Sequence, residues 1–398
     1  TDYPLHLYSM GIYNVNEHPL RLKTGVKWSH YQTDVLPAWV ADMDFEVAQP
    51  IKAALANRVE TSDYGYPVGQ QQTSLPELFC ERVKKKFDWD VMSDSVLLIN
   101  DVVQGLYLGL QTFSKKGEGV VVQPPIYPPF LHSVQETDRR LVSVPLVLRA
   151  NGYGIDFDRL QSSITKSTRI FMLCNPHNPT GRSFSRRELE ELADFCCRND
   201  LLILSDEIHA DLILNDTDHI PIASLGSDIA ERTVTLMSAS KAFNIAGLCL
   251  AFAHFGSANL RKQFDSVPRH TRGGTNTLSI AAVHAAWTQG EEWLENTLGM
   301  LRENRDLVSQ FVASRWPEVV YYPPEATYLA WLDMRALKLS SNPYTHILEE
   351  GRVALGNGVD FGAEGVQHVR LNFARSHDIL VSILERIDKV IVSSREHP

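Results

Sequence analysis

The sequence has little cysteine and no long run of apolar residues. Its five cysteines are odd in number and show no C-x-x-C spacing, which fits reduced thiols in a cytoplasmic protein better than disulfides or a zinc site. No apolar run approaches the roughly 18 residues that cross a bilayer, and the opening residues lack a charged segment followed by an apolar one. We therefore expect a cytoplasmic protein with no membrane attachment and no metal site.

Positive charge is scarce relative to negative charge. The chain carries 38 Lys and Arg against 48 Asp and Glu, a net charge of -10, and its densest basic run is Lys84-Lys85-Lys86. Surfaces that bind nucleic acid are usually basic, so we expect no such partner and interpret this run as a solvated helix face. A length of 398 residues with 44% hydrophobic and 22% charged residues is typical of a globular protein with two large lobes.

Short apolar runs alternate with helical stretches between about residue 90 and residue 255. Runs typical of buried strands occur at residues 96–99, 119–122, 170–174, 201–205 and 234–237. Helices are predicted at 102–113 and 185–199, the second beginning with a capping box because Ser185 lies three residues before Glu188. Strands that are apolar throughout and separated by helices predict a mostly parallel sheet covered on both faces.

The pattern changes after about residue 275. Long helices are predicted at 278–289 and 292–314, and a closing helix near 379–393. Short strands around 328–332 and 369–372 complete a smaller α+β lobe. We therefore expect an α/β protein with a large domain at 51–285 and a small domain formed by 1–50 and 286–398.

Polar or aromatic residues follow four of the predicted strands. They are Tyr127, Asn175, Asp206 and Lys241. In parallel sheets ligands gather at the carboxyl ends of the strands. Taken singly, each residue also has a structural interpretation, as a core aromatic, a turn, a helix cap and a surface lysine respectively.

Together these residue types indicate one cofactor, pyridoxal phosphate. It needs a lysine amine for a Schiff base, a carboxylate that keeps its pyridine nitrogen protonated, and a donor to its phenolic oxygen. It also needs a stacked ring, and hydroxyls or helix N–H groups for its phosphate. Lys241 is then explained as a nucleophile at a strand end, and Ser238, three residues earlier, suits the phosphate.

Several motifs resemble a known family. SxSK at 238–241, NPxNPTG at 175–181, the acid at 206 and VRLNFA at 369–374 resemble the fold-type I aminotransferase superfamily (class I/II) along nearly the whole chain. LPAWVADMDF at 36–45, YGY at 64–66, SDEIH at 205–209 and YLAWLD at 328–333 are similar to the MalY/PatB group of cystathionine β-lyase-type C–S lyases, which includes cystalysin. The resemblance implies the pyridoxal-phosphate-dependent transferase fold type I, whose large domain has a mostly parallel seven-stranded sheet between helices.

The resemblance also implies cofactor-binding roles. Lys241 matches the Schiff-base lysine and general base, Asp206 the partner of the pyridinium nitrogen, and Asn175 the donor to the phenolic oxygen. Tyr127 matches the stacking aromatic. Hydroxyls and helix amides that hold the phosphate are implied at Ser238, Ser240, Val102 and Val103.

Substrate and subunit contacts follow from the same resemblance. Arg370 matches the arginine whose fork clamps the substrate α-carboxylate, and Ala41 matches a substrate-contacting position in WVADMDF. Tyr66 matches a tyrosine that reaches the phosphate from the other subunit, which implies a homodimer with shared active sites. His209 matches a histidine near the cofactor, with a helix-surface histidine as the alternative.

Two positions of the phosphate loop depart from the group's pattern. Asp101 stands where a glycine is usual, and Gln104 stands where a proline is usual. Because an acid is unfavourable beside a phosphate, we expect Asp101 to point away or to contact substrate.

The function expected from these residues is C–S β-lysis. The enzyme would cleave cystathionine or another S-substituted cysteine to a thiol, pyruvate and ammonia. A pyridoxal-phosphate-dependent aminotransferase is the first alternative, since fold-level analogy does not fix the reaction type. A specialised enzyme of amino-acid or secondary metabolism and a non-catalytic binding module are the others.

Overall fold

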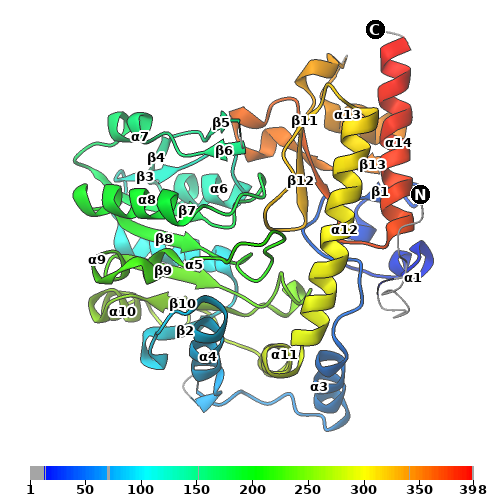
Figure 1. The fold of residues 1–398 in the computed structure, drawn as a ribbon. Coiled ribbons are helices and arrows are strands. Elements are labelled where there is room, and N and C mark those ends of the chain that lie inside the picture. Colours follow the sequence, from blue (N-terminus) through cyan, green and yellow to red (C-terminus); the bar gives the residue numbers. More distant parts are fainter. Residues whose placement is uncertain (1–12, 14, 70–71, 151, 340, 397–398) are drawn as a thin grey trace.

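The computed structural model describes residues 13, 15–69, 72–150, 152–339 and 341–396. The opening residues, whose pattern supports the expectation of a cytoplasmic protein, lie outside this range. Within it, no helix is long and apolar enough to cross a membrane. A seven-stranded sheet and a four-stranded sheet organise the chain (Figure 1).

The larger sheet has the strand order β2-β10-β9-β8-β7-β3-β4. Its strands are β2 (Val96–Ile99), β3 (Gly119–Val122), β4 (Arg140–Ser143), β7 (Thr168–Cys174), β8 (Leu202–Asp206), β9 (Thr233–Met237) and β10 (Ala251–Phe255). β10 runs antiparallel to both of its neighbours, and the remaining pairs are parallel. The expected mostly parallel seven-stranded sheet is therefore confirmed, and the sequence patterns missed only β4 and β10.

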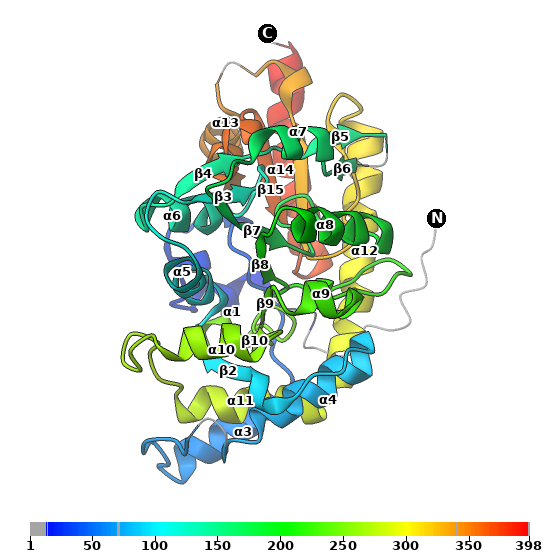
Figure 2. The ribbon, with the colours of Figure 1, turned by 90° about the vertical axis from the view of Figure 1, so that its left-hand side faces the viewer.

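Helices cover both faces of this sheet (Figure 2). One face carries α5 (Val102–Phe113), α6 (Pro128–Glu136) and α10 (Ala258–Asp265). The other carries α7 (Phe157–Ser163), α8 (Arg186–Arg198) and α9 (Ser227–Ala230). Along β7, Ile170 and Met172 face the first set whereas Phe171 and Leu173 face the second, because successive side chains of a strand alternate between faces.

The capping box predicted for α8 is present. The Ser185 hydroxyl accepts from the Glu188 amide, and the Glu188 carboxylate accepts from the Ser185 amide. This start fixes α8 directly after the turn at residues 175–181.

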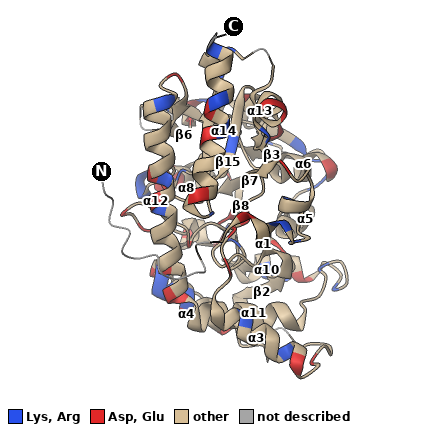
Figure 3. Cartoon of the chain, turned by 90° about the vertical axis from the view of Figure 1, so that its right-hand side faces the viewer, with Lys and Arg blue, Asp and Glu red and all other residues tan. Residues whose placement is uncertain are grey.

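A second lobe is built on the four-stranded antiparallel sheet, whose order is β11-β12-β15-β14. Its strands are β11 (Val320–Tyr321), β12 (Leu329–Asp333), β14 (Gly356–Asn357) and β15 (His368–Asn372). Its helices are α12 (Glu291–Arg315), α13 (Pro343–Gly351) and α14 (His377–Glu396). Acidic and basic residues are interspersed along α12 and α14 (Figure 3).

The N-terminal segment joins this second lobe. β1 (Leu36–Pro37) pairs with β13 (Val353–Ala354) in a small parallel ladder. Other segments form α1 (Glu17–Arg21), α2 (Val26–Ser29), α3 (Gln49–Glu60), α4 (Leu75–Phe87), α11 (Thr277–Gln289) and the hairpin of β5 (Val147–Arg149) with β6 (Gly152–Gly154). The expected boundary at 285/286 falls inside α11, and the domain limits stay a prediction.

Close packing at the end of β10 gives a stability test. A Cβ at position 256 would overlap the carbonyl oxygen of Ala230, so we expect Gly256→Ala to lower the free energy of unfolding by about 1–3 kcal/mol. At Gly299, within α12, a Cβ meets open space, and Gly299→Ala should stabilise by about 0.5–1 kcal/mol. Urea unfolding of both variants checks this, and wild-type stability of Gly256→Ala would contradict it.

Candidate active site at the strand ends

Lys241 follows β9 and reaches toward the N-terminal segment. Its Nζ donates to the Ala41 carbonyl at 2.8 Å. Burial lowers the pKa of Lys241, the Arg370 charge lowers it further, and Asp42 and Asp206 oppose them. An amine in this setting gives up its proton more readily than a surface lysine, which is what a nucleophile or base requires.

Asp206 is the last residue of β8, and its side chain is buried. One carboxylate oxygen accepts from the Ile208 amide at 3.0 Å. Burial raises the pKa of Asp206 to about 7, and the neighbouring Glu207 charge raises it while Lys241 lowers it. The carboxylate therefore has fewer partners than its burial demands, and a cationic ligand group would restore its charged form.

Asn175 follows β7 directly and is fully buried. Its Oδ1 accepts from the Phe184 amide at 3.0 Å, which fixes the orientation of the side chain. Its Nδ2 has no hydrogen-bond partner in the part of the chain that the structure describes. A buried donor without an acceptor is costly, so an oxygen atom of a ligand is expected beside it.

His209 and Tyr127 lie in the same region. His209 is 2% exposed in a turn, so its alternative as a helix-surface histidine is wrong. Burial lowers the pKa of His209 to about 3, and its Nδ1 finds no partner among the described residues. Tyr127 precedes α6, and its backbone N–H donates to the Asn178 carbonyl at 3.1 Å. Burial raises the pKa of Tyr127, and the charges on Arg370 and Asp206 act on its phenol in opposite directions.

Arg370 enters the site from β15, in the second lobe. Its Nη1 donates to Asn178 Oδ1 at 2.9 Å and its Nη2 to the Trp39 carbonyl at 2.7 Å, while the guanidinium lies 4.9 Å from the centre of the Phe361 ring. Burial lowers the pKa of Arg370 to about 10, and its Nε has no partner within the described ranges. The guanidinium of Arg370 is thus held in place, and its Nε–H remains free to donate. This arrangement suits the binding of a carboxylate.

The start of α5 carries the expected phosphate amides. Helix geometry leaves the N–H groups of Val102 and Val103 without intrahelical acceptors. Asp101 turns back onto its own helix and accepts from the Gln104 amide at 2.7 Å. The Gln104 side chain donates to the Arg272 carbonyl at 3.0 Å. This hydrogen bond connects the first turn of α5 to the loop that follows α10.

The two serines before Lys241 make hydrogen bonds within the protein. The Ser238 hydroxyl donates to the Leu250 carbonyl at 2.7 Å and accepts from the Ser240 amide at 3.0 Å. Phosphate binding by Ser238 and Ser240 therefore stays a prediction. Tyr66 is fully exposed and so lies outside the buried group, and its role toward a second subunit also stays a prediction.

Sequence reasoning missed the residues that hold the segment 36–45 across the site. Asn372 Nδ2 donates to the Val40 carbonyl at 2.6 Å and to the Asp42 carbonyl at 2.7 Å. Asn244 Nδ2 donates to the Met43 carbonyl at 3.0 Å. Asn372 lies inside the VRLNFA motif and Asn244 follows Lys241 by three residues, but nothing in their spacing identifies the segment that they bind.

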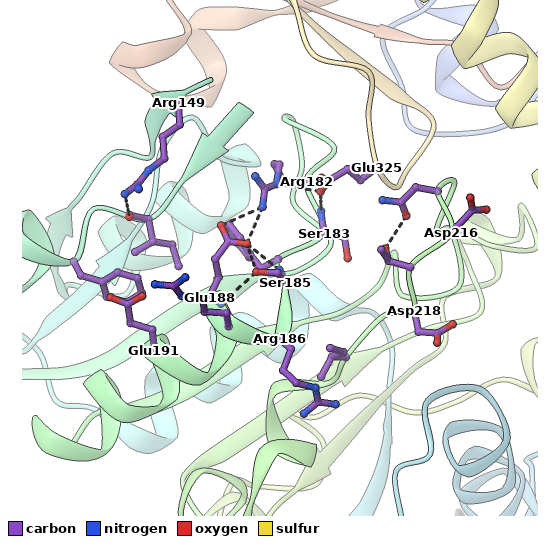
Figure 4. A pocket seen from close by; sticks show the side chains of 17 residues that line it. Arg149, Arg182, Ser183, Ser185, Arg186, Glu188, Glu191, Asp216, Asp218 and Glu325 are labelled. Carbon is purple, nitrogen blue, oxygen red and sulfur yellow. Dashed lines mark hydrogen bonds and ion pairs between the residues drawn. The ribbon is translucent and has the colours of Figure 1, made fainter. Parts of the chain in front are cut away.

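A groove of about 1050 Å³ lies beside the start of α8 (Figure 4). Three of its charged side chains form ion pairs, since Arg182 contacts Glu188 at 2.8 Å and Glu325 at 3.1 Å. Glu325 also accepts from the Ser183 amide at 2.8 Å. This network ties the turn that carries Asn175 to the segment before β12.

The comparison with known proteins agrees with this geometry. The profile of the class I and II aminotransferase family matches residues 41–387. The chain belongs to this family. It is 36% identical over 383 residues to cystathionine beta-lyase PatB of Bacillus subtilis, which covers 94% of this chain and 98% of PatB.

Two solved structures are also similar. Cystalysin from Treponema denticola has a TM-score of 0.89 and 27% identity, and the match covers 94% of this chain and 97% of cystalysin. The C–S lyase from Staphylococcus hominis has a TM-score of 0.87 and 28% identity, with 94% and 97% covered. Both structures contain bound pyridoxal phosphate. The expected fold type is therefore confirmed.

The residues present fit this cofactor. A carboxylate short of partners, a buried amide donor without an acceptor, an amine with a lowered pKa and free helix amides lie at one edge of one sheet. Each corresponds to a different group of pyridoxal phosphate.

The raised pKa of Asp206 predicts that the free energy of unfolding of the cofactor-free protein depends on pH. Below about pH 4 the carboxyl is protonated both folded and unfolded, whereas between its ordinary pKa of 3.8 and the folded value of about 7 only the native state keeps the proton. Its contribution to stability is thus lost progressively as the pH rises from about 4 to about 7, by about 4 kcal/mol in total.

Asp206→Asn removes this titration. Its stability relative to wild type should rise between pH 4 and pH 8, measured by urea unfolding of the two cofactor-free proteins. A constant difference across that range would show that Asp206 keeps an ordinary pKa.

Proposed function

We propose that this protein is a pyridoxal-phosphate-dependent C–S β-lyase that converts an S-substituted cysteine, such as cystathionine, to a thiol, pyruvate and ammonia. The observation that carries the proposal is that Asn175, Asp206 and Lys241 lie at or just after the ends of the neighbouring strands β7, β8 and β9. The charge of Arg370, from β15 in the second lobe, acts on Lys241. The similarity to PatB over nearly the whole chain supports the reaction type.

The cofactor would be held by groups that are otherwise short of partners. The Asp206 carboxylate would pair with the protonated ring nitrogen, Asn175 Nδ2 would donate to the phenolic oxygen, and the Tyr127 ring would cover one face. The Val102 and Val103 amides would bind the phosphate, with the hydroxyls of Ser238 and Ser240 nearby. When bound, pyridoxal phosphate supplies an electron sink for the carbanion at the substrate Cα.

The protein side chains do the remaining work. The Arg370 fork binds the substrate carboxylate and so fixes which bond of Cα faces Lys241. The neutral Lys241 amine removes the Cα proton, and the Ala41 carbonyl accepts a hydrogen bond from the resulting ammonium. Burial of Asn175, Asp206 and Arg370 keeps water away and strengthens each contact.

Product analysis separates lysis from transamination. With cystathionine and no added 2-oxo acid, we expect pyruvate and a thiol in equal amounts and over many turnovers. Lys241→Ala should fold but lose turnover by at least a factor of about 100, because both the nucleophile and the base are gone. Conversion of cystathionine to its own 2-oxo acid with the C–S bond intact, dependent on an added 2-oxo acid that becomes a new amino acid, would instead identify an aminotransferase.

We also propose a homodimer with shared active sites in the cytoplasm. Tyr66 is fully exposed, and Tyr64 and Val68 beside it are 57% and 58% exposed, which leaves an apolar surface for a second copy. Partner contact there would bring Tyr66 to the neighbouring phosphate. All five cysteines are free thiols, which supports a reducing compartment.

Hybrid dimers test whether each active site contains residues of both chains. A dimer of one Lys241→Ala chain and one Tyr66→Ala chain should regain up to about half of the wild-type activity, because one of its sites receives intact residues from both chains. A hybrid of Lys241→Ala with a chain that carries both Arg370→Gln and Tyr66→Ala is the control and should stay inactive. Lack of recovery in the first hybrid would contradict the shared site.

A further inference from the structure

The carbonyl of Ala41 accepts two hydrogen bonds in the site. Lys241 Nζ and the Tyr328 hydroxyl each donate to it at 2.8 Å. The three residues come from the segment 36–45, the end of β9 and the start of β12, so they meet only in the folded protein. Tyr328 is fully buried, and burial raises its pKa well above the usual value, so its hydroxyl remains a donor.

The backbone before Tyr328 is strained. Thr327 has φ = 72°, a conformation that β-branched residues rarely adopt. Its N–H donates to the Leu212 carbonyl at 2.9 Å, and its hydroxyl accepts from the Leu329 amide at 3.2 Å, and these bonds hold the strained residue in place. Such strain persists only where the surrounding contacts fix the residue. The next residue, Tyr328, donates from its hydroxyl to the Ala41 carbonyl.

We propose that Tyr328 is a positioning residue that keeps the Ala41 carbonyl aimed at Lys241 and favours the neutral form of the Lys241 amine. A carbonyl oxygen has two lone pairs, and Tyr328 occupies one of them. Sharing the oxygen with a phenol weakens the hydrogen bond that an ammonium would otherwise make alone, and so disfavours the charged form. This inference rests on the proposed role of Lys241 as nucleophile and base.

Tyr328 also keeps the carbonyl satisfied when Lys241 leaves it. A buried carbonyl without a donor is unfavourable, so without Tyr328 the release of the amine would be opposed. The amine is therefore freer to move between the Ala41 carbonyl and the substrate.

Other charged groups also act on Lys241, and two of them, Asp42 and Arg370, interact with Tyr328 as well. Arg370, from β15, lowers the pKa of Lys241, whereas Asp42, from the N-terminal segment, and Asp206, from β8, raise it. His209, whose ring lies 6.2 Å from that of Tyr328, stays neutral above a pKa of about 3. Removal of the Tyr328 hydroxyl alone leaves the side chains of Arg370, Asp42 and Asp206 in the chain.

Tyr328→Phe, which keeps the ring, tests the inference. The full-length chain without cofactor is acetylated with a trace reagent across a pH range, and mass spectrometry gives the pH of half-maximal reaction for Lys241. We expect this midpoint to move up by at least about 0.5 pH unit in the variant, which is about a threefold loss of neutral amine below the midpoint. In the cofactor-loaded enzyme the acid limb of kcat should move in the same direction.

Tyr13→Phe is the matched control. The Tyr13 hydroxyl is also buried and donates to a backbone carbonyl, that of Trp293 at 3.2 Å, but it does not contact the site. This variant should lose stability without moving the Lys241 midpoint. A Tyr328→Phe protein that is less stable but keeps the wild-type midpoint would reduce Tyr328 to a structural role and overturn the proposal.

The labelling readout does not depend on the reaction catalysed. A shifted Lys241 midpoint in a protein that fails to cleave cystathionine would reject the proposed substrate and retain the role of Tyr328. If Tyr328→Phe does not fold, site-specific replacement of Tyr328 by 3-fluorotyrosine, a stronger donor, should lower the midpoint. An unchanged midpoint there would also overturn the proposal.

Discussion

Several buried polar atoms near the carboxyl edge of the large sheet have no hydrogen-bond partner among the residues that the structure describes, and the proposed chemistry follows from them. Asn175 Nδ2, His209 Nδ1 and Arg370 Nε lack partners among the described residues, and the Asp206 carboxylate has a raised pKa. Each such group costs about 1–3 kcal/mol. A fold keeps several of them together when a ligand supplies the missing partners, and a single pyridoxal phosphate offers groups for most of them.

The N-terminal segment 36–45 connects this edge to the second lobe. Asn244 binds it from the side of β9, and Asn372 binds it from β15. Behind it, the buried Asp44 carboxylate contacts Lys27 at 2.9 Å and lies 3.6 Å from Arg375. Burial lowers the pKa of Lys27 to about 8, so this anchor keeps most of its charge at neutral pH. Ala41 and Arg370, the proposed substrate-binding residues, are thereby fixed relative to Lys241, which belongs to the other lobe.

The sequence predicted those features that depend on neighbouring residues. Runs such as 170–174 are apolar throughout because their strands are buried on both faces, and the strand-end rule then located Asn175, Asp206 and Lys241. The apolar-run pattern missed β4 because it is a partly exposed edge strand, and it missed β10 because that strand contains His254. The sequence did not predict the contacts of Tyr328 with Ala41 and of Asn244 with Met43. The two residues of each pair lie about two hundred residues or more apart, and only tertiary packing brings them together.

The most direct test of the central claim is the protonation state of the pyridine nitrogen in the bound cofactor. Nitrogen-15 NMR of labelled pyridoxal phosphate in the wild-type enzyme should show a protonated ring nitrogen at neutral and mildly alkaline pH, and an unprotonated one in Asp206→Asn. An unprotonated nitrogen in wild type, or the same signal in both proteins, would show that Asp206 does not face the ring and that the strand-end residues do not converge on this cofactor.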